Sequence, residues 1–238
     1  MKKLAILLLF LSGAFGQTVR AQNNPTADEV MNNYLTAIGG KDFLSKIENL
    51  TIQMSTEMQG NPMLVTRKQK APNKFTQVMN AGGMEVFKMV SDGSKISMIS
   101  PRGNQTMEGK DAQQAIMMGT LFPELHMAAL GVKNTLDGVE KIDGKDAYKI
   151  THTAADGSYA WTDFYDTGTG LKVQTVAMQK TPRGEMQQTI RYGDYKDFKG
   201  LKYPTTISQG NGQFQMQLTV DKVRVNEGVK DSDFVVSQ

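Results

Sequence analysis

The side chains that could carry out acid–base, nucleophilic or metal chemistry are few in this sequence. Its two histidines, His126 and His152, are far apart in the chain, and it contains no Cys. It also lacks an H-x-x-x-H pair, a G-x-S-x-G turn, a P-loop and a G-x-G-x-x-G segment. A disulfide scaffold, thiolate metal sites and a cysteine nucleophile are therefore excluded. We expect no enzyme activity, no catalytic residue, no metal site and no cofactor.

Several aspartates are the remaining candidates for chemistry, because carboxylates gathered at a strand end can act together. Asp156, Asp163 and Asp166 lie close together in sequence near predicted strand ends, and Asp92 and Asp143 each precede a glycine. Asp is common in turns, where its side chain bonds to the backbone two residues on. We therefore expect these five groups to be solvated turn residues.

Methionine is abundant, with 16 in the chain. Its side chain is flexible and polarizable and suits surfaces that adapt to varied apolar shapes, such as acyl chains. The alternative is ordinary core packing with Met in place of Leu. We predict an apolar ligand cavity, and its predicted lining residues are Ile52, Met54, Met58, Met79, Phe87, Met89, Met98 and Met216.

A second apolar group lies in a predicted pair of helices, one capped by Asp111 and the other running from Glu124 to Leu130. Its apolar residues cover more than one stripe, so the helices must be buried on several sides or face an apolar cavity. We predict that they form a lid, the alternative being a permanent plug that completes the core. The predicted lid residues are Ile116, Met117, Leu121, Phe122 and Met127.

Strands must position most of these residues. Apolar and polar residues alternate from Leu50 to Met58, which predicts a strand with one buried face. Turn signals such as Asp92-Gly93 and Asp143-Gly144 separate further segments of this kind. The predicted strands are 50–58, 63–70, 74–80, 84–91, 95–100, 139–142, 147–153, 159–166, 171–180, 186–195, 201–208 and 214–225.

About eleven or twelve antiparallel strands rarely stay flat in one sheet, so the sheet should curl. A capping box at Thr26 and Glu29 begins a helix that Gly39-Gly40 ends, and a short helical turn follows at 41–47. The predicted fold is α+β and predominantly antiparallel β. It is an incomplete, unclosed β-barrel of about eleven strands, with helices plugging the concave face.

The N-terminus has the three parts of a secretory signal. A basic start, Met1-Lys2-Lys3, precedes an apolar run at 4–15, which is shorter than the roughly 20 residues that span a bilayer. Val19-Arg20-Ala21 fits a cleavage site. We expect residues 1–21 to be removed after Ala21 and the protein to be periplasmic, the alternative being an uncleaved anchor. No linker divides residues 22–238, which we expect to form one domain.

The charge of the remaining chain argues against nucleic-acid binding. Three of the 27 basic residues and none of the 24 acidic ones lie in residues 1–21, so the two kinds balance beyond that point. Nucleic-acid-binding proteins carry a basic surface. We expect no nucleic-acid partner.

Two short motifs carry a resemblance to a known family. The segment Lys70-Ala71-Pro72-Asn73-Lys74-Phe75, followed by Val90-Ser91-Asp92-Gly93-Ser94-Lys95, resembles a motif pair of the LolA/LolB-like periplasmic outer-membrane lipoprotein-sorting family. Gly200-Leu201-Lys202-Tyr203-Pro204 and Val225-Asn226 are looser matches. The resemblance implies an unclosed barrel with helices as a lid. The carrier LolA has an arginine before the motif proline that helps hold its lid, whereas this chain has Ala71.

Together these observations predict a periplasmic carrier or chaperone. It would bind acyl chains of lipoproteins, lipids or similar hydrophobic ligands in a half-barrel cavity, without catalysis, as a monomer. The alternative is a ligand-free interaction module that docks on an envelope protein or a peptidase. The opening, Ala27-Asp28-Glu29-Val30 to Gly39-Gly40-Lys41, resembles a domain that accompanies some exported zinc peptidases of the pitrilysin type.

Overall fold

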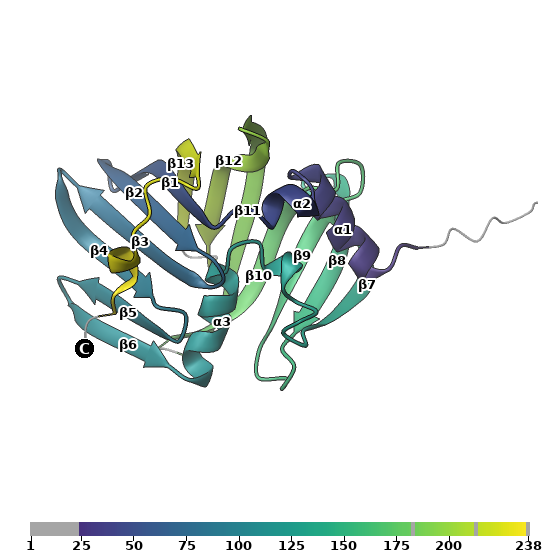
Figure 1. Cartoon of the computed structure of the whole chain (residues 1–238), viewed down its shortest axis with the longest axis horizontal. Coiled ribbons are helices and arrows are strands. Elements are labelled where there is room, and N and C mark those ends of the chain that lie inside the picture. Colours follow the sequence, from purple (N-terminus) through teal and green to yellow (C-terminus); the bar gives the residue numbers. More distant parts are fainter. Residues whose placement is uncertain (1–23, 182–183, 212–213, 237–238) are drawn as a thin grey trace, which may run out of the picture.

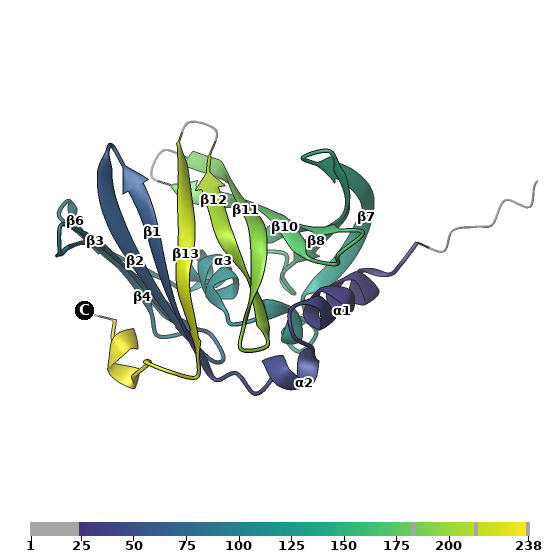
Figure 2. The same ribbon diagram turned by 90° about the horizontal axis from the view of Figure 1, so that it is seen from above.

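Strands make up most of the described chain, which in the computed structural model comprises residues 24–181, 184–211 and 214–236. The predicted signal peptide lies outside these residues. All 13 strands belong to one antiparallel sheet, in the order β6-β5-β4-β3-β2-β1-β13-β12-β11-β10-β9-β8-β7. The sheet curls, and its helices α1, α2 and α3 lie on the inner side of the curl (Figures 1 and 2).

The first half of the sheet consists of hairpins joined by short turns. Its strands are β1 (Asn49–Met58), β2 (Asn61–Lys70), β3 (Lys74–Ala81), β4 (Met84–Ser91), β5 (Lys95–Ser100) and β6 (Gly103–Glu108). Five of these follow the sequence prediction. The sixth, β6, was not predicted, because most of its residues are polar and exposed and Met107 alone does not make an alternation.

The second half is also a series of hairpins. Its strands are β7 (Lys133–Ile142), β8 (Lys145–Thr153), β9 (Ala160–Asp166), β10 (Lys172–Thr181), β11 (Gly184–Phe198), β12 (Leu201–Gly210) and β13 (Gln215–Val225). β7 begins at Lys133 rather than at the predicted Val139, since its register shifts between Leu136 and Gly138 and breaks the simple alternation.

One strand pair joins the two ends of the described chain. β1 lies antiparallel to β13, with Leu50 opposite Val225 and a register shift between Gln53 and Met54. Every other pairing in the described sheet connects strands that follow each other in sequence. β6 and β7 form the two outer edges, and they do not pair with each other. The sheet is therefore unclosed, as predicted, with 13 strands rather than about eleven.

The N-terminal helices follow the prediction closely. α1 (Ala27–Ala37) begins with the predicted capping box, in which the Glu29 backbone N–H donates to Thr26 Oγ1 and the Thr26 N–H donates to Glu29 Oε2. Gly40 has a φ of 86°, a conformation that a side chain would disfavour, and α2 (Lys41–Leu44) follows directly.

The second helical region differs from the prediction. α3 (Lys110–Gly119) begins after Gly109, so Asp111 lies inside the helix rather than at its cap. The predicted helix from Glu124 to Leu130 is wrong: a 3-10 turn, η1 (Pro123–Leu125), is followed by turns up to Gly131. Phe122 adopts a left-handed backbone before Pro123, which prevents α3 from continuing into this segment.

The two motifs that carried the family resemblance lie side by side. Asn73, in the turn between β2 and β3, donates from Nδ2 to the carbonyl oxygen of Gly93 at 3.1 Å. Asp92 accepts from the backbone N–H groups of Ser94 and Lys95, as expected for a turn aspartate. The two motifs thus form one structural unit of adjacent turns.

The last described residues pack on the opposite face of the sheet from α3. Gln69 points toward α3 and donates to the Gly119 carbonyl, so the alternating Lys68 and Lys70 face the other way. There they form ion pairs with Asp233 at 2.7 Å and Asp231 at 2.6 Å in the 3-10 turn η2 (Asp231–Phe234). No helix in the described chain is both long and apolar enough to cross a membrane.

Candidate functional site: an apolar interior and a buried ion network

The largest apolar cluster lies between the helices and the strands β1, β2, β3, β12 and β13. We call it the interior cluster. Six predicted cavity residues belong to it or pack against it: Ile52, Met54, Met58, Met79, Phe87 and Met216. Ile52 is fully buried, whereas Met58 and Phe87 are partly exposed at its margin. The sequence pattern therefore brought these six residues to one side of the sheet.

The other two predicted cavity residues lie elsewhere. Met89 and Met98 pack against a smaller cluster around Phe75, Ile96 and Ile116, between α3 and the strands β3 to β5. The sheet keeps all eight residues on its inner side but divides them between two groups. The role of these residues in ligand binding stays a prediction.

Side chains from the helical segments form part of the interior cluster. Leu35 and Ile38 from the end of α1, and Leu44 from α2, are buried within it. Leu121, from the segment after α3, is also part of it. A bound acyl chain would therefore have to take space that the protein's own side chains fill in this structure.

The predicted lid residues are distributed over all three apolar clusters. Leu121 and Phe122 belong to the interior cluster or pack against it, and Ile116 lies with Phe75. Met117 and Met127 lie in a third cluster with Ile150, which also contains Trp161. The lid residues thus join the clusters, with Leu121 and Phe122 reaching the one that contains most of the predicted cavity.

The segment from Thr120 to Val132 has little regular structure. Its first part is held by Thr120, whose Oγ1 donates to the Ile116 carbonyl at 2.9 Å, and by η1. Phe122 has a φ of 48°, which is uncommon for a residue other than glycine. This segment combines buried apolar side chains, such as Leu121 and Met127, with successive hydrogen-bonded turns in place of a continuous helix.

Beside this segment lies a buried ion network that the sequence did not predict. Lys172, on β10, forms an ion pair with Glu124 of η1 and a second with Asp163 of β9 at 2.9 Å between Nζ and Oδ2. All three residues are at least nine-tenths buried. One lysine therefore holds two carboxylates, one from the sheet and one from the irregular segment.

The sheet supplies further partners for Asp163. Thr175 donates from Oγ1 to Asp163 Oδ1, and Tyr165 donates from Oη to Oδ2 at 3.4 Å. His152 Nε2 lies 3.3 Å from Oδ2, and Nδ1 of the same ring lies 2.8 Å from Asn134 Oδ1. Asp163 is thus fixed on several sides by strands β8, β9 and β10.

These contacts fix the charge states of the central pair. Burial would lower the pKa of Lys172, but the charges of Asp163 and Glu124 outweigh it and hold that pKa well above its usual range. Burial would raise the pKa of Asp163, but Lys172 and His152 bring it well below its usual range. Neither group exchanges a proton readily near neutral pH, which suits fixed charges better than acid–base catalysis.

Aromatic rings enclose the lysine. Its Nζ lies 5.3 Å from the ring centroid of Tyr34 and 5.5 Å from that of Tyr165, both within range of a cation–π interaction. Tyr34 packs against the interior cluster and also against the cluster that contains Trp161. The ion network therefore lies where the two apolar clusters meet.

The prediction that Asp163 would be a solvated turn residue is wrong. Trp161, Asp163 and Tyr165 share one face of β9, and all three are buried. The alternation of the strand carried this information, since two aromatic neighbours at i±2 place the carboxylate on the inner face. Nothing in the local sequence of Glu124 or Lys172 identified them as its partners.

The other aspartates behave as turn residues. Asp166 accepts from the backbone N–H groups of Gly168 and Thr169, and Asp156 accepts from that of Ser158. Asp143 is exposed and pairs with Arg191 at 3.2 Å. Within the described ranges, no group of three or more His, Cys, Asp or Glu side chains could hold a metal ion.

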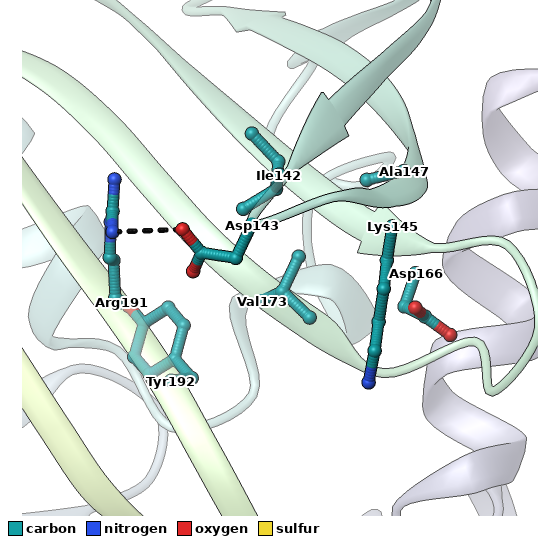
Figure 3. Close-up of a pocket in the computed structure, with 8 residues that line it drawn as sticks. All are labelled: Ile142, Asp143, Lys145, Ala147, Asp166, Val173, Arg191 and Tyr192. Carbon is teal, nitrogen blue, oxygen red and sulfur yellow. Dashed lines mark hydrogen bonds and ion pairs between the residues drawn. The ribbon is translucent and has the colours of Figure 1, made fainter.

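Among the pockets of the described residues, two lie against strands of the second half of the sheet. One has a volume of about 190 Å³ and lies between the β7–β8 turn and strands β10 and β11, with the paired Arg191 and Asp143 on one side of Val173 (Figure 3). The other, of about 340 Å³, lies between α1 and the turn after β9, with Tyr165 and Asn33 in its wall. Neither is lined by the predicted cavity or lid residues.

Comparison with known proteins identifies the fold. No family model matches the chain, and no curated protein matches it. Solved structures do. A LolA superfamily protein from Nitrosomonas europaea has a TM-score of 0.59 and 13% identity, with 90% of this chain and 99% of that chain covered.

Two further structures have the same architecture. A DUF1329 family protein from Desulfovibrio piger has a TM-score of 0.59 at 13% identity, covering 89% of this chain and 98% of that one. A putative outer membrane lipoprotein-sorting protein domain from Vibrio parahaemolyticus has a TM-score of 0.53 at 13% identity, covering 87% and 95%. The expected likeness to the LolA superfamily is confirmed at the level of the fold.

Proposed function

We propose that this protein is an exported, non-catalytic carrier that binds the acyl chains of lipoproteins, lipids or similar hydrophobic ligands. The binding space is the interior cluster, with Met54, Met79 and Met216 in its wall. Its fold is shared with the LolA superfamily protein and with the lipoprotein-sorting domain described above. Residues 1–21 would direct it to the periplasm, and residues 22–238 would form the single carrier domain.

The observation that carries this proposal is that Leu121 is buried in the interior cluster and Phe122 packs against it, both from a segment with little regular structure. The ligand would enter by displacing these two side chains. Met58 and Phe87, which are partly exposed at the margin of the cluster, would form the entrance. Helices α1 and α2 would stay in place as the plug.

The energies are compatible with this exchange. Each acyl methylene removed from water contributes about 0.8 kcal/mol, so a chain of sixteen carbons gains on the order of 10 kcal/mol before association costs. Exposing one Leu and one Phe side chain costs about 3–6 kcal/mol. An acyl chain can therefore compensate for the displaced residues, whereas a short alkyl group cannot.

The test is uptake of a fluorescent fatty acid by the purified protein, followed through the dye and through Trp161 emission. Phe122→Asp should strengthen uptake about tenfold or more, because it removes the apolar contacts with the interior cluster that the ligand must otherwise displace. Leu64→Asp is the matched control, since Leu64 is 63% exposed on β2 and outside the interior cluster. Circular dichroism should show the sheet intact in both variants.

Two results would contradict the proposal. The first is normal uptake by Phe122→Asp, which would remove the lid from the mechanism. The second is no uptake by the unchanged protein and no lipid in organic extracts of protein taken from its own periplasm. The second result, together with a defined complex with an envelope protein, would favour the ligand-free docking module.

A further inference from the structure

The ion network points to a second element of the carrier site, beyond the apolar space. We propose that Lys172 recognises the anionic head group of the acyl ligand, and that Glu124 fills the head-group position while the segment 120–132 is seated. The ligand class is then a single-chain anionic amphiphile with a carboxylate or phosphate head. This inference rests on the proposed function, since it places a head group next to the proposed acyl space.

The first argument is the origin of the two carboxylates around Lys172. Asp163 comes from β9 and is held by Thr175 and Tyr165, so it belongs to the rigid sheet. Glu124 comes from η1, in the segment that carries Leu121 and Phe122. If this segment moves, Glu124 leaves and Asp163 stays. The displacement that opens the apolar space therefore also frees one bonding position on Lys172.

The second argument is the location of that position. Glu124 lies two residues from Phe122 and next to Leu125, and both of these apolar side chains pack against the interior cluster. Lys172 Nζ lies 5.3 Å from the ring centroid of Tyr34, which packs against the same cluster. A ligand with its head at Lys172 could therefore extend its chain into the space vacated by Leu121 and Phe122.

The third argument is charge. The buried group contains one lysine and two carboxylates, and an anionic head group that replaces Glu124 restores the same number of each. A neutral ligand would leave the buried lysine with one carboxylate fewer. Burial acts to lower the pKa of Lys172, but the neighbouring negative charges outweigh it and keep that pKa well above its usual range. An anionic head group in place of Glu124 therefore keeps the lysine cationic.

The experiment compares three ligands with the same chain: dodecanoate, dodecyl phosphate and dodecanol. Their dissociation constants are measured by displacement of a fluorescent fatty acid from the full-length mature protein. At least one of the two anions should bind about tenfold or more tightly than dodecanol, as expected for a charge-assisted hydrogen bond. Whichever of dodecanoate and dodecyl phosphate binds more tightly shows whether the site prefers a carboxylate or a phosphate head group.

Three substitutions distinguish head-group recognition by Lys172 from a purely structural role. Lys172→Met should abolish the preference for the anions, whereas Lys199→Met, which removes an exposed and equally charged lysine, should leave it unchanged. Glu124→Gln should tighten all three ligands and preserve their ratio, because it weakens the hold on the segment and keeps Lys172. If Lys172 had a structural role alone, Lys172→Met would change the affinities for all three ligands by the same factor.

The results distinguish failure of the head-group site from failure of the carrier function. If dodecanol binds as tightly as both anions to the unchanged protein, the head-group site is wrong and the carrier function stands. If none of the three binds, the carrier function itself is wrong. If Lys172→Met does not fold, Glu124→Gln decides: loss of the anion preference in that variant would overturn the role of Lys172, because its lysine is still present.

Discussion

Two regions of the sheet contribute different kinds of side chain to the interior. Strands β1 to β3, with β12 and β13, face the helices through apolar side chains, including Met54, Met63 and Met216. Strands β8 to β10 instead present Asp163 and Lys172 within a shell of aromatic residues. The same curled sheet therefore has an apolar region, whose contacts need no fixed partners, and a polar region, whose charged groups each have a specific partner.

This difference teaches how the fold can combine stability with adaptability. An apolar interior tolerates rearrangement, because dispersion contacts have no fixed partners and Met changes shape easily. A buried ion pair tolerates little, since removal of one member leaves the other unpaired. We infer that β8 to β10 hold the fold firm while β1 to β3 adapt, and three experiments test this contrast.

The largest effect is expected for Asp163→Ala. It removes the carboxylate of β9 that pairs with Lys172, leaves this buried lysine with Glu124 as its carboxylate partner, and should lower the free energy of unfolding by about 3–5 kcal/mol. Urea denaturation of the purified protein measures the change. Asp143→Ala, which breaks an exposed ion pair with Arg191, should cost less than about 1 kcal/mol. Equal losses of unfolding free energy in the two variants would show that the buried ion network stabilises the fold no more than an exposed ion pair does.

A smaller and reversible form of the same loss is expected on acidification. The pKa of Asp163 is lower in the folded than in the unfolded protein, so its contribution is complete above the unfolded value of about 3.9 and is lost as the pH falls through that value toward the folded one. The unfolding free energies of the unchanged protein and Asp163→Asn should therefore differ most above about pH 5, and their difference should shrink progressively as the pH falls below about 3.9 toward the folded pKa. A constant difference would show that Asp163 is not the titrating group.

Of the three experiments, the smallest change in the free energy of unfolding is expected in the apolar region. Met54 is 3% exposed, and Met54→Leu conserves its volume and polarity, so the free energy of unfolding should change by less than about 1.5 kcal/mol. Thermal unfolding at one protein concentration is sufficient to detect it. A loss as large as that for Asp163→Ala would mean that the interior cluster is packed as exactly as the ion network.

The fold was largely predictable because it depends on local signals. Alternation from Leu50 to Met58, the capping box at Thr26 and the Asp-Gly turns each specify a neighbouring element. β6 escaped prediction because this edge strand is almost entirely exposed and contributes one partly buried apolar residue, Met107, which is too little for a pattern of alternation. The segment after Pro123 was misread as a helix, because apolar residues without a clear stripe fit a buried helix or a buried turn equally well.

The candidate site was predictable only in its apolar part. Period-two alternation alone is enough to place Ile52, Met54 and Met58 on one face of their strand. The ion network joins Glu124 to Lys172, which lie on different elements 48 residues apart, and local patterns carry no information about such a partner. The alternation of β9 does put Asp163 on the same face as Trp161 and Tyr165, and this pattern was sufficient to predict that Asp163 is buried.

The pairing of β1 with β13 has a consequence for how the protein forms. Leu50 pairs with Val225, so β1 and β13 are separated by most of the described chain. Every other strand pair in the described sheet joins two strands that are consecutive in sequence. Loop closure over such a distance costs more conformational entropy than a hairpin, and non-local pairing slows folding. Two hairpin arrays can therefore assemble independently, and the step that joins them along this seam should set the folding rate.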